Sequence, residues 1–219
     1  MLWKQCVFHA EGSPAAFLSL ASDGEVCFAV IQDPLASGAP AALRSVLAQS
    51  TLATDATATP GDNPAAPASW PRQIAEHIEQ RLRRRGAGDP AWVLFAGGRA
   101  TRESIEVCTA GDLRVHLLSG RSIVHRTRDH VAANESNESL ARSHPGVPLA
   151  DHPTLLIRSL GSGALPAESV CWPARGITSI VVCSSEIHRH RDPESYLDAL
   201  LDGREGPSEG VWLRLDWEP

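Results

Sequence analysis

Apolar residues recur along this chain in two patterns, and each pattern predicts a different kind of element. Short runs in which apolar residues dominate, or alternate with polar ones, predict β-strands. We expect strands at 3–9, 16–21, 25–31, 91–97, 103–109, 113–118, 121–126, 167–172, 177–183 and 211–217. Asp23-Gly24 and Ser119-Gly120 each supply a glycine that can adopt φ > 0, so both are expected to turn a β-hairpin.

Helices are predicted where apolar residues recur at intervals of three and four. We expect helices at 40–49, at 71–86 and from 192 onward. In the second, Ile74, Ile78 and Leu82 are spaced four apart and define one apolar face. Residues 154–160 fit a strand and a helix equally well.

Two segments between these elements have little to bury. Residues 51–69 are rich in Ala, Thr and Pro, which predicts a flexible loop. Residues 132–153 are polar and irregular, which predicts a surface flap. Strand runs interrupted by pairs of helices are typical of an α+β domain, and we expect residues 1–219 to form a single one.

Composition argues against several classes of protein. A net charge of −6 argues against a nucleic-acid surface. No apolar run is long enough for a membrane span, and Met1–Gln5 lacks the pattern of a signal peptide. The cysteines are scattered without a Cys-x-x-Cys pair, and most fall in apolar strands, so we expect buried thiols. These features predict a cytoplasmic protein that binds neither nucleic acid nor membrane.

The stretch from Ala110 to Val131 carries the most informative motif. Gly111-Asp112-x-Arg114 leads into a strand, the Gly120 turn, a second strand and then Thr127-x-Asp129-His130. This order resembles the hairpin of type-2C metal-dependent serine/threonine protein phosphatases. Weaker similarities to that family follow in the same order, at 28–30, 152–161, 180–184 and 192 onward. The resemblance implies a four-layer αββα sandwich, with two antiparallel β-sheets flanked by helices.

In that family, aspartates hold two manganese or magnesium ions, which activate a water molecule and neutralise the phosphate. The resemblance places four of these aspartates on Ala15, Gln32, Ser185 and Ser208, and a phosphate-binding arginine on Ala10. None of these five residues carries a charge. The resemblance therefore implies a degenerate site with no catalytic residue, no metal and no other cofactor.

Four acidic residues keep an alternative open. Asp33, Glu186 and Glu209 each lie one position beyond an expected aspartate. Such a shift reverses the side chain in a regular strand but has less effect in a turn, so these carboxylates are the residual candidates for a manganese or magnesium site. Asp112 could help to hold a further cation, or could accept backbone N–H groups within its own turn.

Three functions follow from these alternatives. The first is a pseudophosphatase that regulates signalling by binding a protein partner such as a phosphoprotein or a kinase. The second is a divergent but active metal-dependent serine/threonine phosphatase. The third is a structural subunit of a larger assembly. The flap and the tryptophans Trp212 and Trp217 are the candidate contact regions, and the alternative for one or both tryptophans is a place in the core.

Overall fold

The computed structural model describes a large part of the chain. The described residues are 2–9, 15–22, 24–33, 69–84, 92–135, 154–162, 165–188, 198, 201–202 and 210–218. The helix predicted at 40–49, the loop at 51–68 and most of the flap lie outside them. Of the helix predicted from 192 onward, only Asp198, Leu201 and Asp202 are described, the first two in helical conformation.

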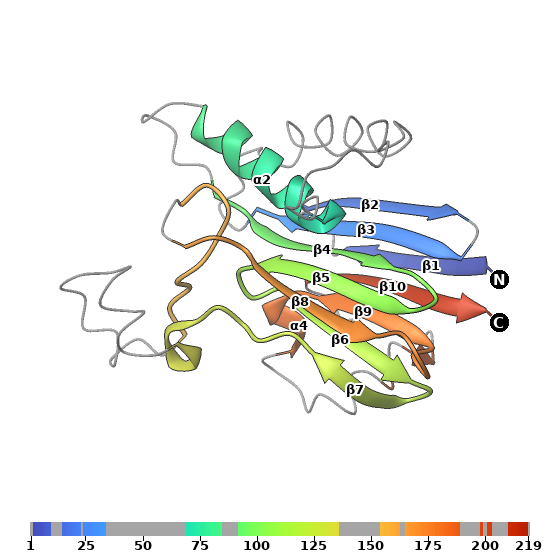
Figure 1. Ribbon diagram of the computed structural model, residues 1–219. Coiled ribbons are helices and arrows are strands. Elements are labelled where there is room, and N and C mark those ends of the chain that lie inside the picture. Colours follow the sequence, from blue (N-terminus) through green and yellow to red (C-terminus); the bar gives the residue numbers. More distant parts are fainter. Residues whose placement is uncertain are drawn as a thin grey trace, which may run out of the picture.

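The described strands form two antiparallel sheets (Figure 1). Sheet 1 has the order β1-β10-β9-β6-β7. Its strands are β1 (Leu2–His9), β10 (Val211–Glu218), β9 (Ser179–Cys183), β6 (Arg114–Ser119) and β7 (Ser122–Arg126). The first and last strands of the chain are therefore neighbours, with Leu2 opposite Glu218 and His9 opposite Val211.

Sheet 2 has the order β2-β3-β4-β5-β8. Its strands are β2 (Ala15–Ser22), β3 (Glu25–Gln32), β4 (Leu94–Ala100), β5 (Ser104–Ala110) and β8 (Glu168–Pro173). Every predicted strand is present with small shifts in its bounds. The strand predicted at 91–97 begins only at Leu94, because Val93 makes an isolated bridge to Leu160 instead.

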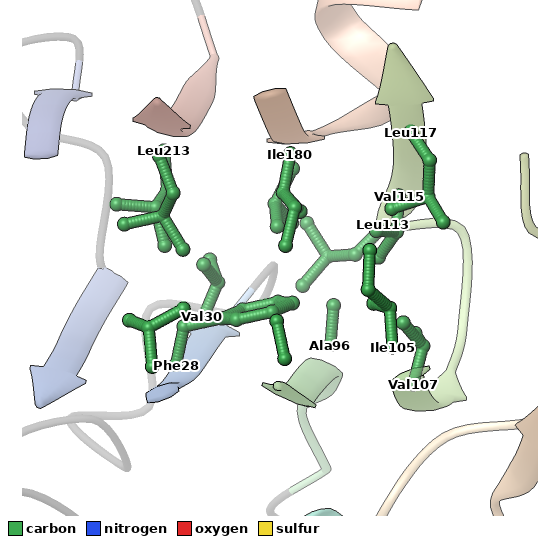
Figure 2. Close-up of a cluster of buried hydrophobic side chains, with 14 of the residues drawn as sticks. Phe28, Val30, Ala96, Ile105, Val107, Leu113, Val115, Leu117, Ile180 and Leu213 are labelled. Atoms are coloured by element: carbon green, nitrogen blue, oxygen red, sulfur yellow. The ribbon is translucent and has the colours of Figure 1, made fainter. Parts of the chain in front are cut away.

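The inner faces of the two sheets enclose the main hydrophobic core. Figure 2 shows side chains from both sheets pointing toward one another across this layer. Sheet 2 contributes Phe28, Val30, Ala96, Ile105 and Val107, and sheet 1 contributes Val115, Leu117, Ile180 and Leu213. Because strand side chains alternate, the odd-numbered residues of β3 face the opposite way.

Helix α2 (Trp70–Arg83) covers the outer face of sheet 2. Its residues Ile74, Ile78 and Leu82 are buried, as their spacing predicts. They pack in one cluster with Ala29 and Ile31 of β3. The helix begins one residue before Pro71, and its last-turn arginines suit the negative end of the helix dipole.

A smaller cluster lies on the outer face of sheet 1. Helix α4 (Ser185–His188) brings Ile187 against Val181 and Trp212, and Leu201 packs on the same cluster. The layers are therefore helix, sheet, sheet and helix, which confirms the expected αββα sandwich. Trp212 is 6% exposed, which agrees with the alternative that this tryptophan belongs to the core.

Three further sequence expectations need correction. Residues 154–160 form neither a strand nor a helix, but bridge at Leu156 to Val131 and at Leu160 to Val93. The flap begins with a short 3-10 helix, Ala132–Asn134, whose first residue is buried. Cys27, Cys108 and Cys183 are buried as predicted, but Cys171 is exposed on β8.

The described helices were compared with what a membrane-spanning helix requires. None of them combines the length and the apolar character that crossing a bilayer would require.

Candidate functional site

The turn after β5 is fixed by reciprocal hydrogen bonds between Gly111 and His130. The Gly111 N–H donates to His130 Nδ1 at 3.0 Å, and the His130 N–H donates to the Gly111 carbonyl at 3.0 Å. Gly111 has φ +109°, and a Cβ there would lie 2.5 Å from a methyl group of Leu94. Glycine is required at this position for both reasons.

The other residues of the hairpin motif also have partners within the chain. Arg114 Nε and Nη2 donate to the two carboxylate oxygens of Asp129 at 2.9 and 2.5 Å. Thr127 Oγ1 accepts the buried N–H of Val115 at 2.9 Å. These contacts fasten the segment after β7 onto β6. The motif residues that resemble the phosphatase family thus have a role in stabilising the fold, whether or not the protein is a catalyst.

The second nitrogen of His130 joins a charged cluster that sequence reasoning missed. His130 Nε2 lies 3.0 Å from Glu168 Oε2, and Arg158 Nη1 donates to the same oxygen at 3.3 Å. Burial lowers the pKa of His130, and the charge of Arg158 lowers it further, against the opposing effect of Glu168. We therefore assign a neutral imidazole that accepts from Gly111 and donates to Glu168.

The pKa of Glu168 responds to the same contacts. Burial would raise this pKa, but the hydrogen bond with His130 and the charges of Arg158 and Arg128 lower it overall. Glu168 is 38 residues from His130 in sequence, so no local pattern links the two.

Ala15 and Gln32 lie together at one end of the layer between the sheets. Val26, Phe28 and Val30 of β3 belong to the core between the sheets, and alternation assigns Gln32 to the same face. Ala15 is the register partner of Gln32 across β2 and β3, and it packs against this core. In this register Gln32, rather than its neighbour Asp33, continues the inner face.

The Gln32 side chain reaches from sheet 2 to the connection after β9 of sheet 1. Its Nε2 donates to Glu186 Oε1 at 3.3 Å, although the two residues are 154 positions apart in sequence. Gln32 is 4% exposed, and its Oε1 has no hydrogen-bond partner among the described residues. A neutral amide and a carboxylate thus link the two sheets at this end.

Ser184 anchors the segment that carries Ser185 and Glu186. The Ser184 N–H donates to the Val211 carbonyl at 2.9 Å, and Ser184 Oγ accepts the Val211 N–H at 3.0 Å. Gly210, with φ +97°, passes so close that a Cβ there would lie 2.6 Å from Ile187 Cγ1 and 2.8 Å from Ser184 Oγ. Sequence reasoning missed Ser184 and Gly210. A glycine directly before the last apolar strand was the available signal.

The remaining candidates are distributed as follows. Asp33 is fully buried directly after β3, and Asp112 is 6% exposed in the turn after β5. Glu186 is exposed and Ser185 half-buried on α4. Ala10, Ser208 and Glu209 lie outside the described residues. Among the residues that are described, no three His, Cys, Asp or Glu side chains are grouped so that they could hold a metal ion.

Solved structures share this architecture. The Mycobacterium tuberculosis serine/threonine phosphatase PstP/Ppp matches with a TM-score of 0.62 at 17% identity, over 100% of this chain and 99% of that chain. The S. agalactiae serine/threonine phosphatase matches with a TM-score of 0.65 at 13% identity, over 100% of both chains. This chain has the type-2C protein phosphatase fold. At these identities the likeness establishes the fold.

Another solved structure shares this fold. A C. elegans sex determining protein aligns with a TM-score of 0.69 at 12% identity, over 98% of this chain and 64% of that chain. No protein-family model and no curated protein matches the sequence.

The type-2C phosphatase fold implies a pair of divalent cations, and the described residues to which the resemblance assigned their ligand positions do not fit them. Two such cations need several anionic oxygens to offset the loss of their hydration shells. Ala15 offers no donor atom, Gln32 and Ser185 offer neutral oxygens, and Glu186 accepts the Gln32 amide. A hydrogen-bonded contact between the sheets therefore occupies positions that the sequence resemblance assigned to metal ligands.

Proposed function

We propose that the protein is a catalytically degenerate phosphatase-like domain, a pseudophosphatase, that acts as a regulatory module by binding a protein partner. The observation that supports this proposal is the buried Gln32 amide, which donates to Glu186 between the sheets and faces Ala15 across β2 and β3. An amide and a methyl group replace two carboxylates there. The fold keeps its shape without the charges that a hydrolytic metal pair needs.

Hydrolysis of para-nitrophenyl phosphate with added manganese or magnesium tests the loss of activity. We expect no metal-dependent turnover. Turnover that requires manganese and disappears in Asp33→Ala would contradict the proposal, and would favour an active phosphatase that uses Asp33, Asp112, Glu186 and Glu209.

Restoring the carboxylates gives a sharper test. The triple variant Ala15→Asp/Gln32→Asp/Ser185→Asp adds three negative charges at the inner end of the sandwich. We expect calorimetry to show manganese uptake by this variant and no stoichiometric uptake of two ions by the wild type. The matched control Ser122→Asp/Ala133→Asp/Ser169→Asp adds the same charge at exposed positions and should bind no manganese. Equal uptake by both triple variants would show that net charge alone attracts the ion.

The partner is proposed to be a phosphoprotein or a kinase that contacts the Glu186 end of the sandwich. Glu186 is exposed, so a charge reversal there changes the surface without opening the core. We expect a captured partner to be lost with Glu186→Arg and kept with Arg126→Glu, a reversal on the exposed face of β7. A partner that co-purifies in fixed ratio and ignores Glu186→Arg would favour a structural subunit instead.

A further inference from the structure

A cavity lies at the end of the sandwich opposite Gln32. Strand β4 starts at Leu94, opposite Gln32, and finishes at Ala100, opposite Val26. The cavity begins at the next residue, Thr101, at the end of the molecule where both chain termini lie (Figure 1). It is therefore separate from the candidate site and does not depend on the proposed function.

The cavity has a volume of about 250 Å³. Three segments supply its walls, namely the β4–β5 turn, the β8–β9 turn and β10. The residues that define its chemistry are Thr101, Arg102, Ile105, Arg175, Ile177 and Trp217. Ligand pockets usually combine an apolar lining with a few polar groups, and this set has that character.

Two arginines of the cavity have no counter-charge among the described residues. Arg102 and Arg175 are exposed, and neither guanidinium has an ion pair or a hydrogen bond with another described residue. Arg99 and Arg114, by contrast, each bind a carboxylate in two-point contact. Two unpaired cations in a chain of net charge −6 favour an anionic ligand.

The rest of the cavity is apolar. Ile105 is 1% exposed and belongs to the core between the sheets. Ile177 and Trp217 are half-buried and line the cavity, and indole is a side chain that can pack against a ring or a guanidinium. A ligand that only carried charge would leave this part of the cavity unused.

Hydrogen bonds join the two turns before any ligand binds. The Ala174 N–H donates to the Glu103 carbonyl at 3.0 Å, and the Ile177 N–H donates to the Ala174 carbonyl at 3.1 Å. Thr101 Oγ1 accepts the N–H groups of Glu103 and Ser104 at 3.3 and 3.1 Å. A preformed cavity reduces the entropy lost on binding.

We propose that this cavity binds an oxyanion, a carboxylate or a phosphate, carried on an apolar body such as an aromatic ring. The guanidinium groups of Arg102 and Arg175 bind the oxyanion, because their planar N–H forks match carboxylate and phosphate oxygens. The apolar body lies against Ile105, Ile177 and Trp217. The ligand is either a free small molecule or the carboxyl-terminal residue of a peptide.

Titration of the full chain with two probes tests the proposal and separates these sources. Phenylphosphonate represents a free aromatic anion that cannot be hydrolysed at an ester bond. N-acetyl-phenylalanine represents a peptide carboxyl terminus. Binding is followed by calorimetry and by the indole N–H signal of Trp217, which a Trp217→Phe variant identifies. Binding of either probe supports the proposal. Tighter binding of phenylphosphonate indicates a free small molecule, and tighter binding of N-acetyl-phenylalanine indicates a peptide carboxyl terminus.

Variants and analogues give the expected sizes of effect. Arg102→Gln and Arg175→Gln should each weaken binding about tenfold, because each removes a charge-assisted hydrogen bond. The control Arg126→Gln, which removes an exposed charge on β7, should leave the affinity unchanged. N-acetyl-phenylalanine amide, which is neutral, and inorganic phosphate, which has no apolar body, should each bind about tenfold more weakly than the matching probe.

The proposal is overturned if neither probe binds at millimolar concentration. It is also overturned if the double arginine variant binds as tightly as the wild type, or if the neutral amide binds as tightly as the acid. Thermal unfolding confirms that each variant is folded. For the wild type alone, affinity should fall as sodium chloride is raised, and a salt-independent affinity would count against oxyanion recognition.

Discussion

The hairpin motif and the Gln32 end of the sandwich differ in how well they match the phosphatase family. The hairpin keeps the residues of the family motif, whereas the Gln32 end lacks the expected carboxylates. In the hairpin, Gly111, Thr127 and His130 each have a partner within the chain that requires that residue type. At the Gln32 end, Ala15 and Gln32 occupy positions where the sequence resemblance predicted carboxylates. Motif residues can therefore support the assignment of a fold, whereas an activity must be inferred from the residues at the site. The two inferences must be made separately.

The two regions also differ in the number and the burial of their hydrogen bonds. The hairpin contacts are buried, numerous and mutually dependent. The Gln32–Glu186 contact is a single hydrogen bond of 3.3 Å with one exposed partner. We expect substitutions in the hairpin to cost far more stability than substitutions at the Gln32 end.

Breaking the Arg114–Asp129 pair should have the largest effect. Their side chains are 16% and 8% exposed, so Asp129→Ala leaves a guanidinium largely buried without its partner. We expect a loss of about 3 kcal/mol in the free energy of unfolding, measured by urea denaturation. The control Glu25→Ala breaks the exposed Arg99–Glu25 pair and should cost less than about 1 kcal/mol. Equal losses of stability in the two variants would contradict the larger contribution expected of the Arg114–Asp129 pair.

Thr127→Val should have the next largest effect. The substitution keeps the shape of the side chain but leaves the buried Val115 N–H without the Thr127 hydroxyl. We expect a loss of about 1–2 kcal/mol, again by urea denaturation. Ser122→Ala, at an exposed position on β7, is the control and should be neutral. A neutral Thr127→Val would refute the role assigned to this hydroxyl.

The pH dependence of stability should report His130. Its pKa is lowered in the folded state below the ordinary value of 6.5, so the unfolded chain binds more protons than the folded chain between these two values. Stability from this group is thus complete above pH 6.5 and declines as the pH falls through the lowered pKa. The Glu168 contribution is lost only below its ordinary value of 4.5, outside this window.

Urea denaturation of the wild type and of His130→Gln between pH 5 and 7.5 measures this contribution. The stability difference between the two should shrink as the pH is lowered from 6.5. A difference that stays constant over this range would contradict the neutral state assigned to His130.

Gln32→Leu should have the smallest effect. The variant removes the amide at nearly constant volume, and the exposed Glu186 carboxylate can return to water. We expect a change of about 1 kcal/mol or less in either direction. A loss above about 2 kcal/mol would show that the Gln32 end is as tightly built as the hairpin, and the comparison would fail.

Local sequence signals predicted most of the described fold. Alternating apolar residues identified the strands, and the four-residue spacing of Ile74, Ile78 and Leu82 identified α2 with its buried face. The turn at Gly120 has φ +59°, which agrees with the expected hairpin. Helix α4 was missed, since four residues are too few to show a helical period.

The candidate site was predicted only in part, because its contacts are distant in sequence. The resemblance placed Ala15 and Gln32 on site positions, and the strand register makes them partners on the adjacent strands β2 and β3. No local pattern could have paired Gln32 with Glu186, or His130 with Glu168. Residues 154–160 were ambiguous because they are shaped by bridges to Val131 and Val93 rather than by their own periodicity.

The pairing of β1 with β10 has a consequence for the order of folding. Sheet 2 contains strands only up to Pro173, whereas sheet 1 needs Val211–Glu218 to lie between β1 and β9. During synthesis, sheet 2 can assemble before β10, the neighbour of β1 among the described strands, has been made. Contacts this distant along the chain slow folding, so closure of sheet 1 should be the late step, after the last strand leaves the ribosome.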